Sequence, residues 1–583
     1  MPKPDNERKG YVGTIAAVKC GLGGLASNLN PSVISLRNVI QAEGAVFRQD
    51  HWRKEPGSFL FGTNNAAVVD PDDAVIVALL DWHPTETVQR IVHLRGDGKL
   101  YFTDPNPGVT GNPAAFVSTT TSGVGTRFGY FVLGGADAAA PTTRKAFVFR
   151  SNFNVTVIEG DVTNDTAIAL PAADWSNATP PIVGLINGPR LWAAGNTSSP
   201  HSLYASKDGD QEDFTTASGS STDPQTLSIF PGVGQRIMAL CNYRGFIVVF
   251  KYPRGIMLVD ARDADPINWV TQMVTDTVGV APSPYAALQL ENDVLFIGAD
   301  GQFYLLSTVI SAAAGQNNMA VANLGMNLEI YQFLLEAYNR NLLGSVQSVY
   351  QPFWQTATFS VAGLGSEQNN TRLIFDFTAV GRKGGDPRFT YSYRDKAASL
   401  ALWRDPNDFI EKPIFGDYVG NIVELEQEVR SAWDGAAYPM RIQTPHSNLG
   451  EFEGLEDSLG KFVQFANRNK QYDQLEIEYL PFTSGIVSIT IFVDGVKRGP
   501  TLEQSLCDGG KPLGFSDVDT AAFVIGDSLL AGGVTRSRVI RTAVGDGRRI
   551  SYLFENENAG EDIAITHLYI FFRNGDTNNP RFC

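Results

Sequence analysis

The sequence has few cysteines and no long apolar run. Its four cysteines, Cys20, Cys241, Cys507 and Cys583, lie far apart and include no C-x-x-C pair. They indicate neither a zinc site nor a disulfide framework, and they fit synthesis in a reducing cytoplasm. Because no uninterrupted apolar run reaches about 18 residues, we expect no membrane insertion. The polar residues 1–10 predict that there is no signal peptide.

Basic residues are fewer than acidic residues. The chain has 46 Lys and Arg against 62 Asp and Glu, which gives a formal net charge of −16. Phosphate binding relies on clustered Lys and Arg, so this balance argues against a surface made to grip nucleic acid. It leaves open a surface along which DNA passes without adhering, because like charges repel.

Sequence motifs of catalysis and metal binding are missing. There is no G-x-S-x-G elbow, no P-loop and no H-E-x-x-H. The glycine cluster Gly21 to Gly24 lacks the lysine of a phosphate cradle. No histidine has a second metal ligand at helical or hairpin spacing. The six histidines are His51, His83, His93, His201, His446 and His567. We therefore predict no catalytic residues, no metal site, no cofactor and no enzymatic activity.

What the chain does have is β-sheet composition. Its 583 residues include 35 Phe, 19 Tyr, 57 Gly and 31 Pro. Aromatic residues favour strands, and all-β proteins need a turn residue every few positions. A chain of this length exceeds one ordinary core, so we expect either several cores or one radially repeated architecture.

A loose recurrence of strand, tight turn and strand favours the radial architecture. Apolar runs flank turns such as Pro253-Arg254-Gly255 and Ala299-Asp300-Gly301, and the Asp-Gly pair is a strong hairpin signal. About six or seven such units lie between residues 40 and 430, which predicts a β-propeller whose blades bury their faces by stacking. A series of unrelated β-sandwiches explains the same pattern and stays open as an alternative.

The domain prediction follows from changes along the chain. Residues 1–40 are expected to be an N-terminal arm, 41–432 a β-propeller-like domain, and 433–583 a C-terminal β-sandwich, with the boundary between Ser431 and Gly450. Apolar residues at helical spacing predict one inserted helix over 323–343. This helix either packs against the blades or lies between subunits.

Two short segments invite functional interpretations. Ser206 to Phe214 partly matches the Ser-x-Asp-x-Gly-x-x-Trp turns of sugar-hydrolysing propellers, but its glycine comes one position early and the tryptophan is missing. We interpret it as an acidic turn, with a Ca²⁺ site at Asp208, Asp210 and Asp213 as the lesser alternative. Arg95-Gly96-Asp97 resembles an adhesion triplet, yet it falls in a predicted hairpin turn, where Gly and Asp serve the backbone.

Two longer segments resemble the tail nozzle and packaged-DNA stabilisation proteins of short-tailed bacteriophages. The first combines Leu36 to Ile40, Gly44 to Arg48 and Arg53 to Ser58. The second combines Asn187 to Trp192, Leu203 to Ser206, Asp210 to Phe214, Ile237 to Phe250 and Tyr252 to Gly255. With the residues between them, the two segments extend over residues 36–255 of the chain. The likeness is one of pattern.

The resemblance implies a structural virion protein in the phage tail or neck. It would form a homo-oligomeric ring, usually of six copies, that retains packaged DNA and forms part of the channel for its ejection. Its expected partners are copies of itself, neighbouring adaptor, tail or fibre proteins, and passing genomic DNA bound without sequence specificity. A C-terminal sandwich is not constant in that family, so an outer tail decoration stays open. The alternative function is a carbohydrate-binding or carbohydrate-hydrolysing β-propeller.

Overall fold

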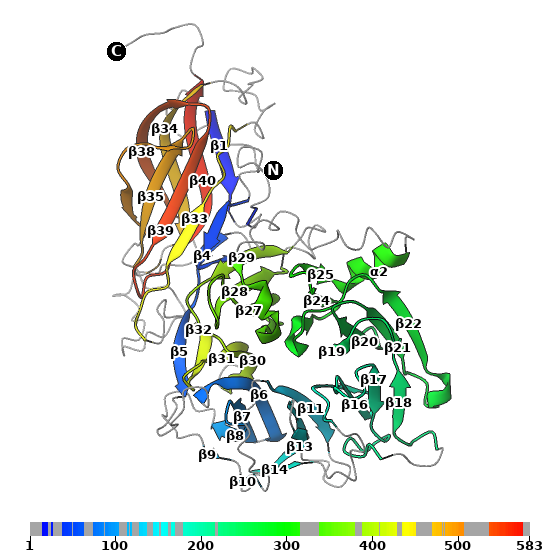
Figure 1. Cartoon of the computed structure of the whole chain (residues 1–583). Coiled ribbons are helices and arrows are strands. Elements are labelled where there is room, and N and C mark those ends of the chain that lie inside the picture. Colours follow the sequence, from blue (N-terminus) through cyan, green and yellow to red (C-terminus); the bar gives the residue numbers. More distant parts are fainter. Residues whose placement is uncertain are drawn as a thin grey trace.

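The structure is a computed structural model of the whole chain. It describes residues 14–20, 25–26, 38–48, 51–62, 74–86, 88–103, 114–115, 117–118, 128–136, 144–150, 153–160, 165–169, 179–215, 220–314, 337–378, 387–406, 409–427, 434–449, 469–480, 482, 484–506 and 536–574. Regular structure in these ranges is almost entirely β-strand. A ring of small sheets carries a second body at its rim (Figure 1).

Seven small, mainly antiparallel groups of strands follow one another around the ring as blades 1 to 7. Six of them are separate sheets, and blade 6 is part of a larger sheet. Blade 1 contains β6 (Ile76–Thr85), β7 (Val88–Arg95), β8 (Leu100–Thr103) and β9 (Ala114–Ala115). Blade 2 contains β11 (Tyr130–Ala136), β12 (Arg144–Arg150), β13 (Phe153–Gly160), β14 (Asp165–Ala169) and β10 (Val117–Ser118). Blade 3 contains β15 (Val183–Asn187), β16 (Arg190–Ala194), β17 (Ser202–Ala205) and β18 (Gln225–Ser228). Blade 4 contains β19 (Arg236–Tyr243), β20 (Phe246–Tyr252), β21 (Ile256–Asp260) and β22 (Val270–Thr275). Blade 5 contains β23 (Ala287–Gln289), β24 (Val294–Ile297) and β25 (Phe303–Leu305). Blade 6 contains β26 (Gln347–Gln351), β27 (Thr356–Ala362), β28 (Asn369–Asp376) and β29 (Arg388–Ser392). Blade 7 contains β30 (Ser399–Arg404), β31 (Glu411–Gly416), β32 (Ile422–Gln427) and β5 (Gly57–Gly62). The all-β, propeller-like fold predicted from the sequence is confirmed.

The first strand of each blade lies innermost, and these strands close a ring. In the order β6, β11, β15, β19, β23, β26 and β30, each contacts the next, and β30 returns to β6. Blade 7 is completed by β5, which comes from the N-terminal side of blade 1 and pairs antiparallel with β32. Backbone hydrogen bonds between two distant parts of the sequence therefore close the propeller, in addition to side-chain packing.

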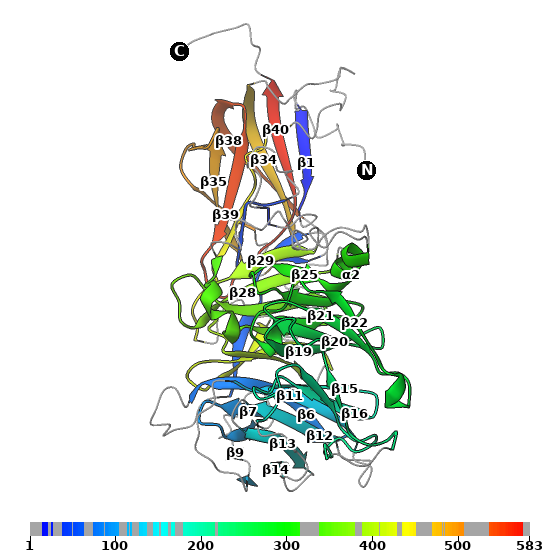
Figure 2. The same ribbon diagram turned by 45° about the vertical axis from the view of Figure 1, so that its right-hand side comes forward.

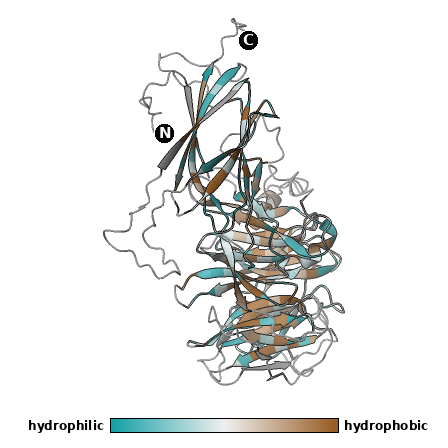
Figure 3. Cartoon of the chain, turned by 90° about the vertical axis from the view of Figure 1, so that its left-hand side faces the viewer, coloured by the Kyte–Doolittle hydropathy of each residue, from teal (hydrophilic) through white to brown (hydrophobic). Residues whose placement is uncertain are grey.

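Stacking of neighbouring blades supplies the core of the ring. Val92 of blade 1 and Val148 of blade 2 share one buried cluster, while Phe149 of blade 2 and Leu191 of blade 3 share the next. Strands covered on both faces need no polar alternation. Accordingly, the five residues from Ile247 to Lys251 in the middle of β20 are all buried, and hydrophobic residues run along the blades (Figure 3).

Two Asp-Gly turns, Asp97-Gly98 and Asp300-Gly301, have the same structure. In blade 1 the Asp97 carboxylate accepts the hydroxyl of Tyr101 at 2.8 Å. In blade 5 the Asp300 carboxylate accepts the hydroxyl of Tyr304 at 2.6 Å. Each aspartate also accepts the backbone N–H two residues further on. Both turns link the second and third strands of their blade, so they are one structural element used twice.

The second body consists of two packed sheets and stands off the ring (Figure 2). One sheet contains β3 (Ala45–Arg48), β4 (His51–Lys54), β40 (Ala564–Asn574), β34 (Lys470–Leu480) and β38 (Arg536–Gly547), with β1 (Thr14–Lys19) on β40. The other contains β2 (Gln41–Glu43), β33 (Met440–Gln443), β39 (Ile550–Asn556), β35 (Ile486–Val493), β36 (Val496–Lys497) and β37 (Leu502–Ser505). Trp52 of the first sheet and Phe554 of the second pack with ring centroids 6.2 Å apart. This body is the predicted β-sandwich.

The strand pairing corrects the predicted N-terminal boundaries. β1, expected in a separate arm, pairs antiparallel with β40 over its whole length. Strands β2, β3 and β4, expected in the propeller, belong to the sandwich sheets. The sandwich therefore takes strands from both ends of the chain, and the propeller sequence starts with β5. Hydrophobic patterns locate strands but do not say which distant strand each one pairs with.

The two bodies share one sheet. β29, the outer strand of blade 6, pairs in parallel with β2 at Tyr391 and Glu43, and β2 pairs antiparallel with β33 of the sandwich. A single ten-stranded sheet thus runs from blade 6 into the sandwich. Although β33 lies in the stretch expected to form the boundary, it is an integral strand of that sheet.

The predicted inserted helix over 323–343 lies mostly outside the described residues. Its described end, from residue 340, belongs to a 3₁₀ helix, Arg340–Ser345. A helix that the sequence analysis missed, α2 (Leu306–Ala314), directly follows β25. The Asp293 carboxylate accepts the N–H of Ser307 in its first turn at 3.0 Å, which stabilises a helix start. Within the described ranges, no helix is long and apolar enough to cross a membrane.

Candidate functional site at the propeller–sandwich junction

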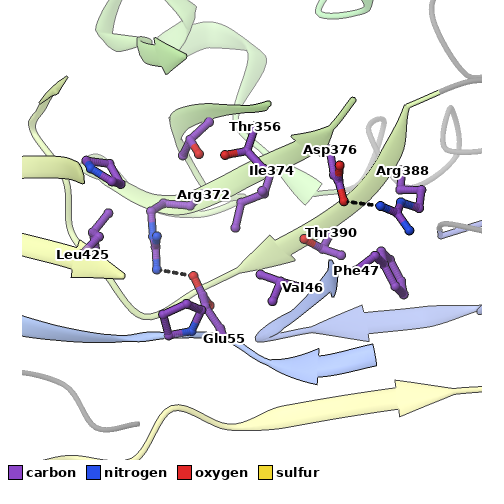
Figure 4. Close-up of a pocket in the computed structure, with 13 residues that line it drawn as sticks. Val46, Phe47, Glu55, Thr356, Arg372, Ile374, Asp376, Arg388, Thr390 and Leu425 are labelled. Atoms are coloured by element: carbon purple, nitrogen blue, oxygen red, sulfur yellow. Dashed lines mark hydrogen bonds and ion pairs between the residues drawn. The ribbon is translucent and has the colours of Figure 1, made fainter. Parts of the chain in front are cut away.

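A small polar cavity lies where the sandwich meets blades 6 and 7. Its enclosed space is about 30 Å³, close to the volume of one water molecule. The lining residues come from strand β3, from the link between β4 and β5, and from blades 6 and 7. They are Val46, Phe47, Glu55, Pro56, Thr356, Thr358, Arg372, Ile374, Asp376, Arg388, Thr390, Pro413 and Leu425 (Figure 4). A space of this size holds no substrate, so the chemistry of the junction is that of its own charged groups.

Arg372 of β28 is the central residue of the junction. One terminal nitrogen lies 2.5 Å from the Glu55 carboxylate and also forms an ion pair with Asp395. The Tyr438 hydroxyl donates to Asp395 at 2.8 Å and lies 3.0 Å from the hydroxyl of Ser58. We call Glu55, Ser58, Arg372, Asp395 and Tyr438 the junction cluster. It joins blade 6, the strand that closes the ring and the chain entering β33.

Burial makes these charges strongly interdependent. Arg372, Glu55 and Asp395 are only 4%, 3% and 5% exposed. Burial raises the pKa of Glu55; Arg372 opposes that shift, and Asp395 adds to it. For Arg372, burial lowers the pKa, but the two carboxylates outweigh burial and leave its pKa above the usual value. One cation thus neutralises two carboxylates away from water, and its removal would leave uncompensated buried charge.

Three further contacts fix the same region. Arg388 donates to the Asp376 carboxylate at 2.6 Å across the β28–β29 pair (Figure 4). The buried Lys54 donates to Asn556 of the sandwich at 2.5 Å. Gly44 adopts a φ of +56°, and a Cβ atom there would lie 1.9 Å from the carbonyl oxygen of Pro439. Glycine at position 44 therefore allows the close approach of two backbones at the junction.

The histidines are dispersed over the molecule. His93 is buried in blade 1 and stacks on Tyr101. His201 contacts Lys251, and His567 lies 3.0 Å from Glu478. His51, His83 and His446 lie in β4, in β6 and after β33. Within the described ranges, no three His, Cys, Asp or Glu side chains meet in a group that could hold a metal. The absence of a metal, a cofactor and catalytic residues stays a prediction.

The acidic turn after β17 is held by its own hydrogen bonds. The Asp213 carboxylate accepts the N–H of Thr215 at 2.8 Å, and Asp210 accepts that of Glu212 at 3.1 Å. Among the residues that the structure describes, Asp208, Asp210 and Asp213 do not come together as a group that could hold a metal ion. Arg190 stabilises this region by donating a hydrogen bond to the carbonyl oxygen of Ser221 at 2.9 Å.

The Arg95-Gly96-Asp97 triplet is part of the blade 1 hairpin. Arg95 is only 4% exposed, and its guanidinium lies 4.3 Å from the ring centre of Tyr101. The arginine of the triplet is therefore buried, whereas an adhesion loop would expose it to solvent. The cysteines Cys20 and Cys241 are buried and not disulfide-bonded, whereas Gly21 to Gly24, Cys507 and Cys583 lie outside the described residues.

The junction cluster was not among the residues predicted from the sequence. Arg372 and Glu55 are 317 positions apart, and no local pattern predicts such a pair. One signal was present: Arg372 directly precedes the apolar run Leu-Ile-Phe in β28, and charged residues are rarely buried unless they are paired. The sequence therefore indicates that Arg372 pairs with an acidic residue, but it does not indicate which one.

No protein-family model and no curated protein matches the sequence. Among solved structures, the computationally designed Ika8 protein is similar over 63% of this chain and 99% of its own, with a TM-score of 0.34 and 11% identity. The WD40 domain of Toxoplasma gondii coronin is similar over 66% of this chain and 88% of its own, with a TM-score of 0.38 and 9% identity.

Proposed function

We propose that this chain is a structural subunit of a bacteriophage particle, in a tail nozzle or head-to-tail connector. In this role it helps to retain packaged DNA and forms part of the channel for DNA ejection. The observation that carries the proposal is the ten-stranded sheet that joins propeller and sandwich. A subunit under internal pressure needs two bodies that do not move apart, and a shared sheet with a buried ionic cluster supports that requirement.

The position of the phage-like sequence segments supports the same role. The first segment supplies Val46, Phe47, Glu55 and Pro56 to the junction cavity, and its Ser58 contacts Tyr438. Residues of this first segment thus lie at the contact between the two bodies. The likeness therefore falls on a structural element of the fold.

The charge of the chain fits a DNA channel. A net charge of −16 disfavours adhesion of the passing phosphate backbone. The proposed partners are further copies of this chain in a ring of six, the number that the resemblance implies, and the adaptor, tail or fibre proteins beside it. The proposed location is the tail or neck of the virion, after synthesis in the host cytoplasm.

Labelling of particles tests the location. Gold-tagged antibodies against this chain, applied to purified particles of the phage that encodes it, should mark the tail or neck in electron micrographs. Antibodies against the major head protein serve as the control and should mark the capsid. Label on the capsid alone, or no label on intact or disrupted particles, would contradict the proposal.

Incubation with polysaccharides tests the competing function. The purified chain should release no reducing ends from bacterial capsular or cell-wall polysaccharides. A carbohydrate-hydrolysing propeller would instead turn them over with a pH profile set by paired carboxylates. Sustained turnover, lost on replacing a carboxylate, would overturn the structural role.

A further inference from the structure

A second cavity, on the propeller itself, differs in kind from the junction cavity. It is a pocket open to solvent with a volume of about 430 Å³, and that volume lies within the range of small-ligand sites. Three consecutive blades line it, on the face that carries the β16–β17 and β20–β21 turns. The lining residues are Thr197 and Pro200 of blade 3, Gln235, Arg236, Met238 and Tyr252 of blade 4, and Pro282 of blade 5. Arg236 begins β19, the innermost strand of its blade, opposite Tyr252.

Arg236 has no acidic partner in the described part of the chain, despite the overall excess of acid. Its Nε atom donates to the sulfur of Met238 at 3.3 Å, which leaves its two terminal nitrogens with no partner among those residues. Burial lowers the pKa of Arg236. A partly buried guanidinium with free donors, lining a cavity, is an arrangement that favours a bound anion.

A second cation of blade 4 does not line the cavity. Lys251 precedes Tyr252 on β20 and is fully buried. Its ammonium donates to the carbonyl oxygens of Ile229, Phe230 and Val233 at 2.5, 2.9 and 3.0 Å. The ammonium of Lys251 is thus satisfied by its own carbonyl partners, and Arg236 is the one cationic side chain among the residues that line the cavity.

We propose that this cavity binds a small carboxylate carried on a ring. The carboxylate pairs with the planar fork of Arg236, which matches its two oxygens. The ring packs against Tyr252, which presents an aromatic surface, and Gln235 and Thr197 supply hydrogen bonds to ring substituents. The inference is independent of the assembly role, so each can fail without the other.

Ligand-observed NMR on the full chain tests the site, with benzoate and glucuronate as probes. Their uncharged amides, benzamide and glucuronamide, are the matched controls for the carboxylate. At low salt at least one acid should bind with a dissociation constant of about 1 mM or below, and its amide about tenfold or more weaker. Comparing the two acids distinguishes a flat aromatic ring from a sugar ring.

Variants locate the binding. Arg236→Gln should weaken binding of the acid about tenfold or more, and Arg236→Lys should restore it only in part, because the planar fork is lost. Arg254→Gln, a change at an exposed arginine of the same blade that does not line the cavity, should leave binding unchanged. Thermal unfolding confirms that each variant is folded. Equal binding of acid and amide, no acid binding below about 10 mM, or unchanged binding by folded Arg236→Gln would overturn the proposal.

Discussion

Arg372 in blade 6 and Glu55 in the link between the sandwich and the closing strand of the propeller form a buried ion pair at 2.5 Å. Both ends of the propeller sequence meet here, because Glu55 comes two positions before β5, which completes blade 7. The same pair therefore stabilises the closed ring and its attachment to the sandwich.

Replacing Arg372 should destabilise the protein severely. Arg372→Met leaves Glu55 and Asp395 as buried carboxylates without a cation, and the free energy of unfolding in urea should fall by about 3–5 kcal/mol. Arg573→Met is the control, since Arg573 pairs with Asp473 at 2.8 Å but is half exposed, and it should cost less than about 1 kcal/mol. Equal effects of the two changes would contradict the role of the cluster.

Gly44 should not tolerate a methyl group. In Gly44→Ala the new Cβ lies 1.9 Å from the carbonyl oxygen of Pro439, so the backbones of the junction must move apart. We expect a loss of about 2 kcal/mol or more in the free energy of unfolding and faster proteolysis between propeller and sandwich. Gly188→Ala has a similar φ, +60°, with nothing within 4 Å, and should cost only about 1 kcal/mol. Similar losses at both positions would argue against the close contact.

Stability should depend on pH through His93. Burial, followed by the nearby Arg95, lowers the pKa of His93 well below its usual 6.5. The unfolded chain therefore takes up this proton first, and the stability contributed by neutral His93 is complete above pH 6.5 and is lost as the pH falls below it. As the pH falls from 6.5 to 5, the free energy of unfolding of wild type should decrease by about 2 kcal/mol more than that of His93→Phe. Parallel curves for wild type and variant over this range would contradict the prediction.

The tyrosine hydroxyls of the two Asp-Gly turns should each contribute to stability. Tyr101→Phe and Tyr304→Phe each remove a hydroxyl that donates to a carboxylate, at Asp97 and Asp300. Each should lower the free energy of unfolding by about 1.5–3 kcal/mol, as expected for a hydrogen bond to a charged group. Tyr304 should show the larger effect, because it is fully buried. If both changes left stability unaffected, the hydroxyl contacts would contribute nothing to the turns.

Much of the fold could be predicted from the sequence, because strands and turns are local. The hairpin around Asp300-Gly301 and the strands flanking Pro253 to Gly255 lie where the patterns indicate. The membership of β1 to β4 in the sandwich could not, because it depends on pairing between residues such as Ala16 and Ile570. The same limit hid the pair of Arg372 and Glu55. The recurrence of tyrosine four positions after Asp97 and Asp300 was visible in the sequence and was missed.

Imaging of the purified chain tests the central claim most directly. Electron microscopy of the full chain, alone and after mixing with the adaptor protein of its phage, should show closed rings in which each subunit contributes one propeller and one sandwich around a central opening. A chain that stays monomeric under both conditions, and that is missing from the tail and neck of imaged particles, would contradict the claim.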